Sequence, residues 1–193
     1  MLRNQLRPAI VMTLVLCVIT GLIYPGIVTA FAQVAFPGQA NGSIVRVNGR
    51  VVGSALIGQP FTQPYYFHSR PSAAGSSYDA SASSGTNKGP TDAKLADTLI
   101  AANIDTVVAT DGAVRGRIPS DMVTSSASGL DPDISPANAQ LQVARVARAR
   151  HADSAAVRAL VDAHVTHRQF NFFGEPRVNV LLLNIALDSA FKR

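Results

Sequence analysis

The longest run of apolar positions lies near the N-terminus. No charged side chain occurs between Pro8 and Phe36, a stretch of 29 residues. A helix needs about 20 apolar residues to cross the hydrocarbon core of a bilayer. The pattern therefore predicts a transmembrane helix over residues 9–36, preceded by a cytoplasmic segment 1–8 and followed by one exported domain, 37–193.

Basic residues around this run predict its direction. Arg3 and Arg7 precede it, and the next basic side chain is Arg46. Loops on the cytoplasmic side of a membrane carry an excess of Lys and Arg. We therefore expect a single-pass protein of the bacterial inner membrane, with its N-terminus in the cytoplasm and its C-terminal domain outside.

Three residues late in the run affect its local geometry. Pro25 has no backbone N–H, so the helix should kink or end near Tyr24 and Pro25. Gly21 offers a place for close contact with another helix, because small residues let helix backbones approach each other in lipid. A single glycine without a small-xxx-small repeat also fits ordinary membrane-helix composition.

A cleaved signal peptide is the alternative interpretation of the run. Ala30-Phe31-Ala32 has the small-x-small form that signal peptidase reads, and cleavage after Ala32 would release a secreted domain or hydrolase. The apolar region of a signal peptide is usually about 7–15 residues long. This run continues past Val28, and its length favours a retained anchor.

Turn residues and aromatic residues organise the chain after the run. Asn48-Gly49 stands between the apolar segments 44–47 and 50–52, and this dipeptide supplies the positive φ angles of a type I′ hairpin turn. Residues 60–90 show no helical period. Their aromatic members are Phe61, Tyr65, Tyr66, Phe67 and Tyr78. Because these side chains can pack, we expect a long ordered loop.

Helical patterns dominate the second half of the chain. We expect a helix over residues 92–103 with Thr91 as its N-cap. A short strand over residues 106–109 follows, because both of its valines are β-branched, but periodicity alone does not separate so short a run from helix. Ser135-Pro136 then opens a helix to about Arg150, with a capping residue and a first-turn proline in their favoured places.

Two further helices follow. One starts at Asp153 and fades by His167, and Asn179 caps a closing helix with Leu183 and Leu187 on one side. Strands early and helices mostly late predict an α+β fold. Its parts are one N-terminal transmembrane helix and a two-layer exported domain, in which helices cover a small antiparallel or mixed sheet.

Charge and cysteine usage narrow the function classes. The net charge of +5 comes from 17 basic and 12 acidic residues, and the scattered arginines do not form the basic stripe that nucleic acid requires. The densest group, Arg145, Arg148 and Arg150, is typical of a solvated helix face. The only cysteine, Cys17, lies in the apolar run, which excludes a disulfide framework within one copy.

The residues alone indicate neither a catalytic centre nor a metal site. The chain has no P-loop, no Asp-Lys-Thr-Gly phosphorylation motif and no Gly-x-Ser-x-Gly elbow, so any ATP chemistry belongs to a partner. His164 and His167 are three residues apart. Two ligands do not make a metal site. The other histidines, His68 and His151, have no local acidic or cysteine companions, and a surface or capping role is the better interpretation of them.

A series of short motifs, in a fixed order along the chain, indicates a protein family. They are Arg7-Pro8-Ala9, Ile19-Thr20-Gly21, Tyr24-Pro25, the segments 39–43 and 53–59, Tyr66-Phe67-His68, the segments 70–73, 84–87 and 123–131, Gln142 with 145–150, Val178-Asn179-Val180, Leu183-Asn184 and Leu187-Asp188. In this order they resemble the C subunit of the Kdp-type potassium-transporting ATPase across nearly the whole chain. Thr86 stands where a serine is usual.

The resemblance implies a non-catalytic accessory subunit of a high-affinity, ATP-driven potassium uptake pump. Its partners would be a channel-like potassium-conducting subunit, a P-type ATPase subunit and a very small membrane peptide. ATP and potassium would be handled through the complex, without a cofactor of this chain's own. We expect partner contacts at two places, the membrane helix and the aromatic loop. The residues involved are Gly21, Tyr24, Pro25, Phe67 and Arg70.

The resemblance also implies a role in complex assembly and as a catalytic chaperone that raises the ATP affinity of the ATPase subunit. Gln142, inside a helical family motif, is the candidate nucleotide contact. An exported domain does not meet cytoplasmic ATP, however. We therefore expect a structural or ion-entry role outside the membrane, with any effect on ATP transmitted through the complex.

Overall fold

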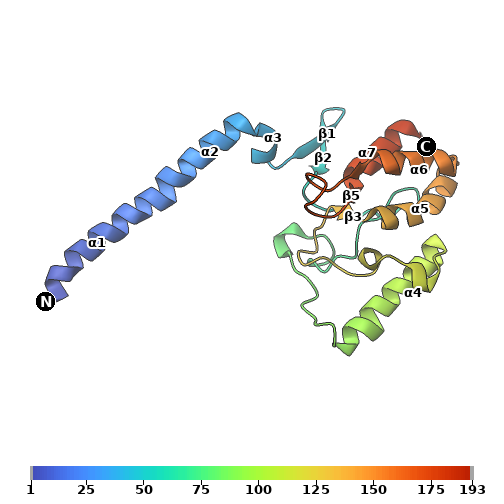
Figure 1. The fold of residues 1–193 in the computed structure, drawn as a ribbon, viewed down its shortest axis with the longest axis horizontal. Helices are drawn as coiled ribbons and strands as arrows, with labels where there is room; N and C mark the ends of the chain where they lie inside the picture. The colour runs from blue at the N-terminus through green and yellow to red at the C-terminus, as the bar shows by residue number, and fades with distance from the viewer. Residues whose placement is uncertain (1, 192–193) are drawn as a thin grey trace. The chain divides into compact units, whose positions relative to one another are not determined.

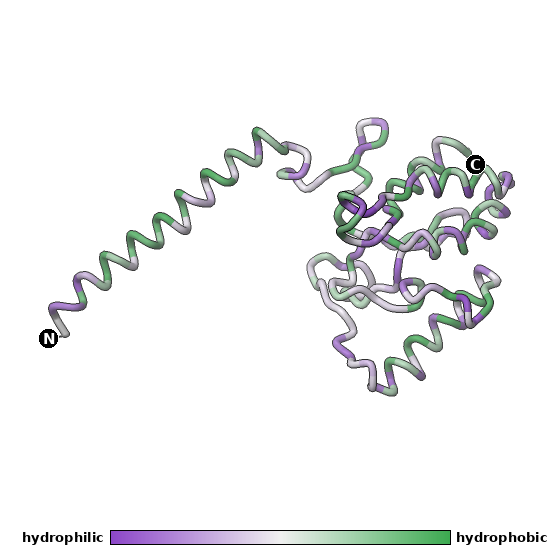
Figure 2. The backbone as a smooth tube through the Cα atoms, in the orientation of Figure 1, coloured by the Kyte–Doolittle hydropathy of each residue, from purple (hydrophilic) through white to green (hydrophobic). Residues whose placement is uncertain are grey.

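The computed structural model describes residues 2–191 and divides the chain into two compact units, Met1–Val51 and Val52–Arg193. The first unit begins with three consecutive helical elements: α1 (Leu2–Val18), the π-helical turn η1 (Ile19–Ile23) and α2 (Tyr24–Ala35). Within them Asn4–Ala35 is long and apolar enough to cross a membrane, with a mean hydropathy of 2.3. Figure 2 shows apolar positions along this helix.

Of the two effects predicted for Pro25, an end of the helix is wrong, and a kink stays a prediction. The helix neither stops nor gives way to a loop at Tyr24, and Figure 1 shows α1 running on into α2. Instead, the turn just before Pro25 widens, and the Tyr24 N–H donates to Ile19 O. A proline cannot donate to the carbonyl four residues back and crowds it, and a π-helical turn accommodates both effects.

The β-hairpin confirms the prediction from Asn48-Gly49. The short helix α3 (Pro37–Ala40) leads into β1 (Ile44–Val47), which pairs with β2 (Arg50–Ser54) in a two-stranded sheet. Asn48 and Gly49 have φ angles of 50° and 79°. Both values lie in the left-handed region that a type I′ turn requires, so the local sequence determined this element.

A three-stranded antiparallel sheet forms the centre of the second unit. Its strand order is β3 (Asp133–Ile134), β5 (Arg177–Asn179) and β4 (Val165–Thr166). Val178 of the central strand faces Ile134 on one side and Val165 on the other. Helices α5 (Pro136–Ala149), α6 (Ser154–Ala163) and α7 (Val180–Ala190) share one core with this sheet. The predicted α+β class is confirmed.

Helix starts in this unit follow the predicted capping residues. The Ser135 side chain accepts from the Asn138 amide, Asp153 accepts from two amides of the first turn of α6, and Asn179 accepts from the Leu182 amide. Each bond satisfies an N–H that the helix leaves unpaired. Helix α6 ends earlier than predicted, at Ala163, because Val165 pairs with β5, and His167 lies outside it.

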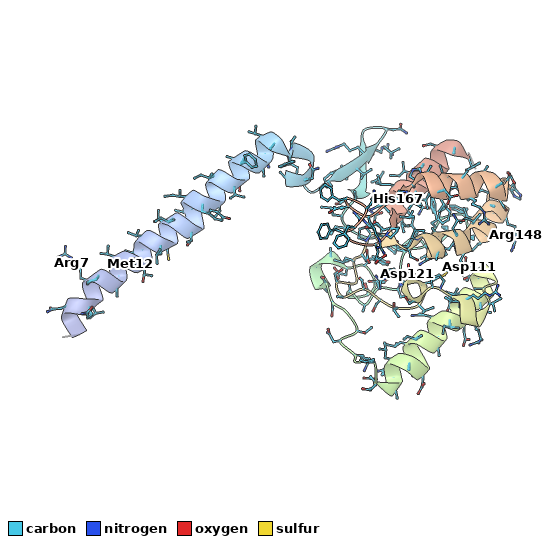
Figure 3. All side chains as sticks on the ribbon, in the orientation of Figure 1. Arg7, Met12, Asp111, Asp121, Arg148 and His167 are labelled. Atoms are coloured by element: carbon cyan, nitrogen blue, oxygen red, sulfur yellow. The ribbon has the colours of Figure 1, made fainter. Side chains whose placement is uncertain are left out.

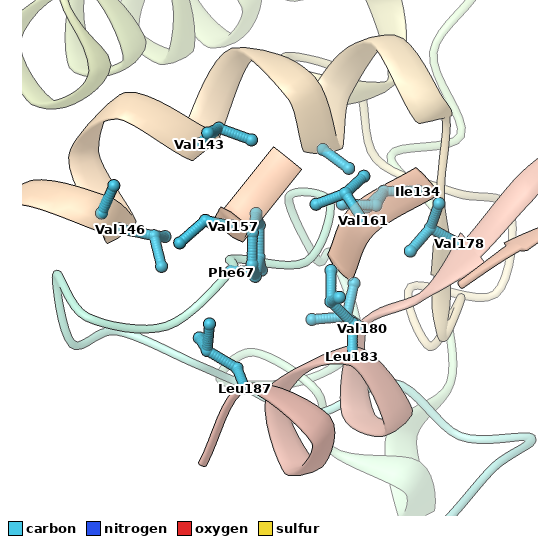
Figure 4. Packing of buried hydrophobic residues seen from close by; sticks show 12 residues of the cluster. Phe67, Ile134, Val143, Val146, Val157, Val161, Val178, Val180, Leu183 and Leu187 are labelled. Atoms are coloured by element: carbon cyan, nitrogen blue, oxygen red, sulfur yellow. The ribbon is translucent and has the colours of Figure 1, made fainter. Parts of the chain in front are cut away.

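The main core contains one aromatic ring from the long loop. Phe67 is fully buried, and Figure 4 shows it among side chains of α5, α6 and α7. The aliphatic members of this cluster include Val143, Val146, Val157, Val161, Val178, Leu183 and Leu187. Burying such a side chain contributes roughly 1.5–3 kcal/mol. The loop between Pro60 and Pro90 is therefore part of the core, although its only helical element is the short η2 (Ala80–Ala82).

The predicted strand over residues 106–109 is wrong. A π-helical segment, η3 (Lys94–Ile100), continues directly into α4 (Ala101–Asp111) and takes in these residues. Ile100, Ile104 and Val107 recur at helical spacing and pack with Met122 and Val123 in a second apolar cluster. This tertiary packing overrides the β-propensity of the valines.

The ends of this helix also differ from the prediction. Asp92, rather than Thr91, accepts a bond from a first-turn amide, that of Leu95. Gly112 ends α4 in a left-handed conformation. Two short 3-10 turns, η4 (Arg115–Arg117) and η5 (Ser120–Met122), then return the chain to the sheet.

Candidate functional site

Residues 64–68 of the long loop, here called the clamped segment, lie beside α5 and α7. They contain no strand, so their backbone groups need partners elsewhere. The Phe67 N–H donates to Asn184 Oδ1 at 2.8 Å, and Asn184 Nδ2 donates to the Phe67 carbonyl at 2.9 Å. One side-chain amide of α7 thus gives Phe67 both bonds that a neighbouring strand would give.

Gln142 of α5 does the same for the next residue. The His68 N–H donates to Gln142 Oε1 at 2.7 Å, and Gln142 Nε2 donates to the His68 carbonyl at 3.1 Å. Nε2 also donates to Asn138 Oδ1, and Oε1 also accepts from Arg145. An amide offers two donors and two acceptor positions, so Gln142 is fully satisfied within the domain.

Two arginines of α5 and its C-terminal end hold the rest of the clamped segment. Arg145 Nη1 donates to the carbonyls of Pro64 and Tyr66, at 2.6 and 2.8 Å. Arg150 Nε donates to the Tyr65 carbonyl at 2.8 Å, and its guanidinium lies 5.2 Å from the centre of the Tyr66 ring. Charge-assisted bonds of this kind are stronger than neutral ones, so the segment is held firmly.

These arginines correct one interpretation of the sequence. Arg145 and Arg150 are both only 7% exposed, whereas Arg148 between them is exposed. Their charges are balanced by Asp111 of α4 and Asp188 of α7, at 2.8 and 2.7 Å. Figure 3 labels Asp111 near the end of α4 and Arg148 on α5. The solvated face predicted for this group therefore holds for Arg148 alone.

A hollow of about 400 Å³ opens beside the clamped segment, between it and α4. Its lining includes His68, Arg70, Asn103, Asp111 and Gln142. Burial lowers the pKa of His68, and the nearby positive charge of Arg145 lowers it further. The imidazole Nε2 lies 3.0 Å from the Gln63 carbonyl, which suits a neutral ring that donates this bond.

A second polar cluster joins the loop to the strand β3. Arg70 pairs with Asp131 at 2.8 Å and reaches the carbonyls of Thr124 and Ser125. Asp133 lies nearby on β3, where burial raises the pKa of its carboxyl group. The cluster therefore ties the family motif at 123–131 to the loop.

Two further residues, Tyr78 and Asp121, add hydrogen bonds around this cluster. The Tyr78 hydroxyl donates to the Arg70 carbonyl, and burial raises the pKa of Tyr78 to about 12. Asp121 accepts from the amide and hydroxyl of Ser135 and from Asn138 Nδ2. Because Asn138 also bonds to Gln142, the polar contacts continue from Asp121 to the clamped segment.

The structure brings together three of the residues singled out in the sequence. Gln142 and Phe67 belong to the clamp and its core, and Arg70 lines the adjacent hollow. Sequence reasoning missed Asn184 and Asp111, which complete the clamp. A signal for Asn184 was present, because it lies between the apolar positions Leu183 and Leu187 of the closing helix.

The remaining singled-out residues lie in the other unit. Gly21 belongs to the π-helical turn, and a Cβ placed there would meet nothing within 4 Å. Tyr24 begins α2 beside Pro25, and its side chain is 65% exposed. Within the described residues, no group of three or more His, Cys, Asp or Glu could hold a metal ion. His164 Nδ1 lies 2.8 Å from the Leu160 carbonyl. His151 is exposed, as predicted, whereas His68 is half-buried.

Comparisons with known proteins cover nearly the whole chain. Residues 6–189 match the family model described as KdpC, K+-transporting ATPase, c chain. The potassium-transporting ATPase KdpC subunit of Gemmatimonas aurantiaca is 65% identical over 96% of this chain and 93% of its own length. The subunits of the same name from Koribacter versatilis and Caulobacter vibrioides are 53% and 55% identical, over 97% of this chain and 95% and 94% of theirs.

Proposed function

The chain belongs to the KdpC family, the C chain of the K+-transporting ATPase, and from this premise we propose that it is a membrane-anchored, non-catalytic assembly subunit of an ATP-driven potassium uptake pump. The observation that carries the proposal is the match over residues 6–189, which includes both the apolar helix and the clamped segment. Its partners would be a channel-like potassium-conducting subunit, a P-type ATPase subunit and a very small membrane peptide.

The anchor has support in the sequence and in the helix itself. Asn4–Ala35 contains one basic residue, Arg7, and is otherwise uncharged. We propose that this helix spans the inner membrane with the N-terminus in the cytoplasm and the domain outside, following the basic residues before it. Helix α2 continues through residues 30–32, and a helical site is a poor protease substrate, which favours a retained anchor over cleavage after Ala32.

The clamp supports a role as a rigid docking body. Side chains from two helices fix each residue of the clamped segment, and family motifs far apart in sequence supply them. A preorganised surface loses little conformational entropy when it binds a partner. We propose that the domain holds partner subunits together outside the membrane, with Arg70 and the neighbouring loop at the contact.

The effect on ATP affinity would then be indirect. The amide of Gln142 is 1% exposed and has all its hydrogen-bonding positions filled, so a nucleotide would have to displace His68 or Arg145 to reach it. We propose that Gln142 is a positioning residue. The chain would raise ATP affinity by stabilising the conformation of the ATPase subunit that binds nucleotide.

Deletion and restoration of this chain test the proposal. Cells that depend on this pump should fail to grow at low potassium without the chain, and the channel and ATPase subunits should no longer co-purify. A photoreactive ATP analogue should label the ATPase subunit of the complex and leave this chain unlabelled. Co-purification of the partners without this chain would contradict the assembly role, and labelling at α5 would contradict the indirect mechanism.

Topology and processing need a separate test. The single cysteine, Cys17, should resist impermeant thiol reagents, whereas Ser81→Cys, at an exposed position of the loop, should be labelled in intact cells. Labelling of Ser81→Cys only after lysis would contradict the orientation. Mass spectrometry should find the N-terminal segment intact, and a mature N-terminus at Gln33 would favour the secreted alternative.

A further inference from the structure

Three phenylalanines stand exposed on the loop between β4 and β5. Phe170, Phe172 and Phe173 are 91%, 75% and 60% exposed, although phenylalanine is usually among the buried residue types. They lie within residues 169–174, here called the aromatic tip. The rings of Phe172 and Phe173 meet edge to face, with their centres 5.0 Å apart. The tip therefore presents one apolar surface to its surroundings.

Backbone bonds fix the shape of this tip. Gln169 and Phe173 exchange both N–H···O bonds at 2.9 Å, and the Phe172 amide also donates to the Gln169 carbonyl. Phe170 and Asn171 have φ angles of 53° and 60°. A bulky side chain rarely adopts this left-handed conformation, because it costs free energy. The hydrogen bonds that close the loop maintain it here. The three rings are thus displayed by a defined turn.

Charge is confined to the base of the loop. Residues 169–174 contain no charged side chain, and Arg168 pairs with Glu175 at 2.7 Å just below them. The tip can therefore enter an apolar phase without burying a charge. The Arg168–Glu175 pair remains at the base of the tip, where both exposed side chains can stay in water. This division is typical of segments that lie in a membrane interface.

The chain keeps a bilayer within reach of the tip. Residues 36–51 connect the end of α2 to the second unit. Fully extended, 16 residues would span at most about 50–60 Å, and α3 and the hairpin make this connection shorter still. A tether of this length keeps the local concentration of lipid high. We propose that the aromatic tip inserts into the interfacial layer of the bilayer that the N-terminal helix crosses, as a second membrane contact. The inference rests on the proposed membrane anchoring.

The absence of tryptophan from the sequence gives a direct test. Phe172→Trp places a single fluorophore on the tip, and Val114→Trp places one at a 66% exposed position of another loop. Each full-length variant is reconstituted into nanodiscs that contain anionic lipid brominated at an upper acyl position. We expect bromine to quench Phe172→Trp by about half or more and to leave Val114→Trp unchanged, because an interfacial segment penetrates about 5–10 Å.

A companion variant separates insertion from folding. Phe170→Asn removes one ring, and asparagine tolerates the left-handed backbone that Phe170 adopts. Combined with Phe172→Trp, it should reduce quenching while the thermal unfolding temperature stays the same or rises. Quenching that this change leaves intact would overturn the proposal, since the apolar surface would then have no part in the contact.

Other results of the quenching experiment would contradict the lipid contact of the aromatic tip. Equal quenching of Phe172→Trp and Val114→Trp, or no quenching of either, would overturn a specific insertion. In the purified complex in nanodiscs, protection of Phe172→Trp from acrylamide without bromine quenching would assign the tip to a partner subunit, against the lipid contact. Failure of the chain to enter nanodiscs at all would refute the anchor, and co-elution with lipid distinguishes this result from failure of the tip alone.

Discussion

Arg145 donates through Nε to Asp111 Oδ1 at 2.8 Å, and the two side chains are only 7% and 2% exposed. This pair joins the end of α4 to the middle of α5, two helices that also share apolar contacts at Leu141. Arg145 at the same time holds two carbonyls of the clamped segment. The position of α4 and the position of the loop are therefore set by one guanidinium group.

Replacement of Asp111 should strongly destabilise the folded domain. Asp111→Ala leaves the buried guanidinium of Arg145 without its counter-ion, and we expect a loss of roughly 3–5 kcal/mol in the free energy of unfolding. Asp105→Ala is the matched control on the same helix, because its partner Arg115 and Asp105 itself are 67% and 61% exposed. Its loss should stay within about 1 kcal/mol. Urea unfolding of the purified chain measures both, and equal losses would contradict the assigned role of Asp111.

His68 should make the domain sensitive to mild acid. Burial and the charge of Arg145 lower its pKa below the ordinary 6.5, so the unfolded chain binds a proton more readily than the folded one. The stabilising contribution of the neutral ring is then complete above about pH 6.5 and is lost as pH falls through the lower folded value. Unfolding curves between pH 7 and pH 5 should show this slope, and His68→Gln should flatten it. An unchanged slope would place the titrating group elsewhere.

Two glycines with the same backbone conformation should respond differently to a methyl group. Gly112 and Gly129 have φ angles of 67° and 68°, but a Cβ at Gly112 meets nothing, whereas one at Gly129 would lie 2.6 Å from the Ala74 nitrogen and the Ser84 oxygen. We expect Gly112→Ala to cost about 1 kcal/mol from backbone strain alone. Gly129→Ala should cost about 3 kcal/mol, because the loops must also move apart. Similar melting temperatures for the two variants would contradict the close approach at Gly129.

The apolar N-terminal helix allows a test of partner contact. A Cβ added at Gly21 or at Gly26 would meet no neighbouring atom within 4 Å other than those of its own helical turn, so both positions are open on the side where a side chain would stand. If Gly21 packs against a partner helix, Gly21→Leu should weaken association by about 1–3 kcal/mol. Gly26→Leu adds the same volume five residues further along the chain, and it should leave recovery of the partners unchanged because the expected contact is at Gly21. Full recovery with Gly21→Leu in detergent pull-downs would mean that this face meets lipid.

Local signals account for the elements that the sequence predicted. The uncharged run predicted a helix from its own 29 residues, and the Asn48-Gly49 turn and the caps Ser135 and Asn179 each act over a few residues. The structure confirms the helix, the turn and the caps. Pro25 was also a local signal. The predicted end of the helix there was wrong, because a helix can widen by one residue as well as end, and sequence alone does not distinguish these responses.

Non-local contacts account for what the sequence did not predict. The bonds of Gln142 and Asn184 to the clamped segment join residues 74 and 117 positions apart. No window of sequence contains both partners. The same holds for α4, where Met122 and Val123 decide between helix and strand for Val107. The burial of Arg145 and Arg150 follows from these contacts, and their residue type alone pointed to the surface.

The dependence of Phe67 on Asn184 has a consequence for the order of events during synthesis. Chain elongation proceeds at about 5–20 residues per second, so Phe67 waits about 6–23 seconds for a partner made 117 residues later. During that interval the aromatic residues of the clamped segment have no core to enter, and they are natural targets for a holding chaperone. A chain that stops before the last helix leaves them exposed permanently. Completion of α7 is thus the step that allows Phe67 to enter the core, and the first 179 residues cannot complete this domain without it.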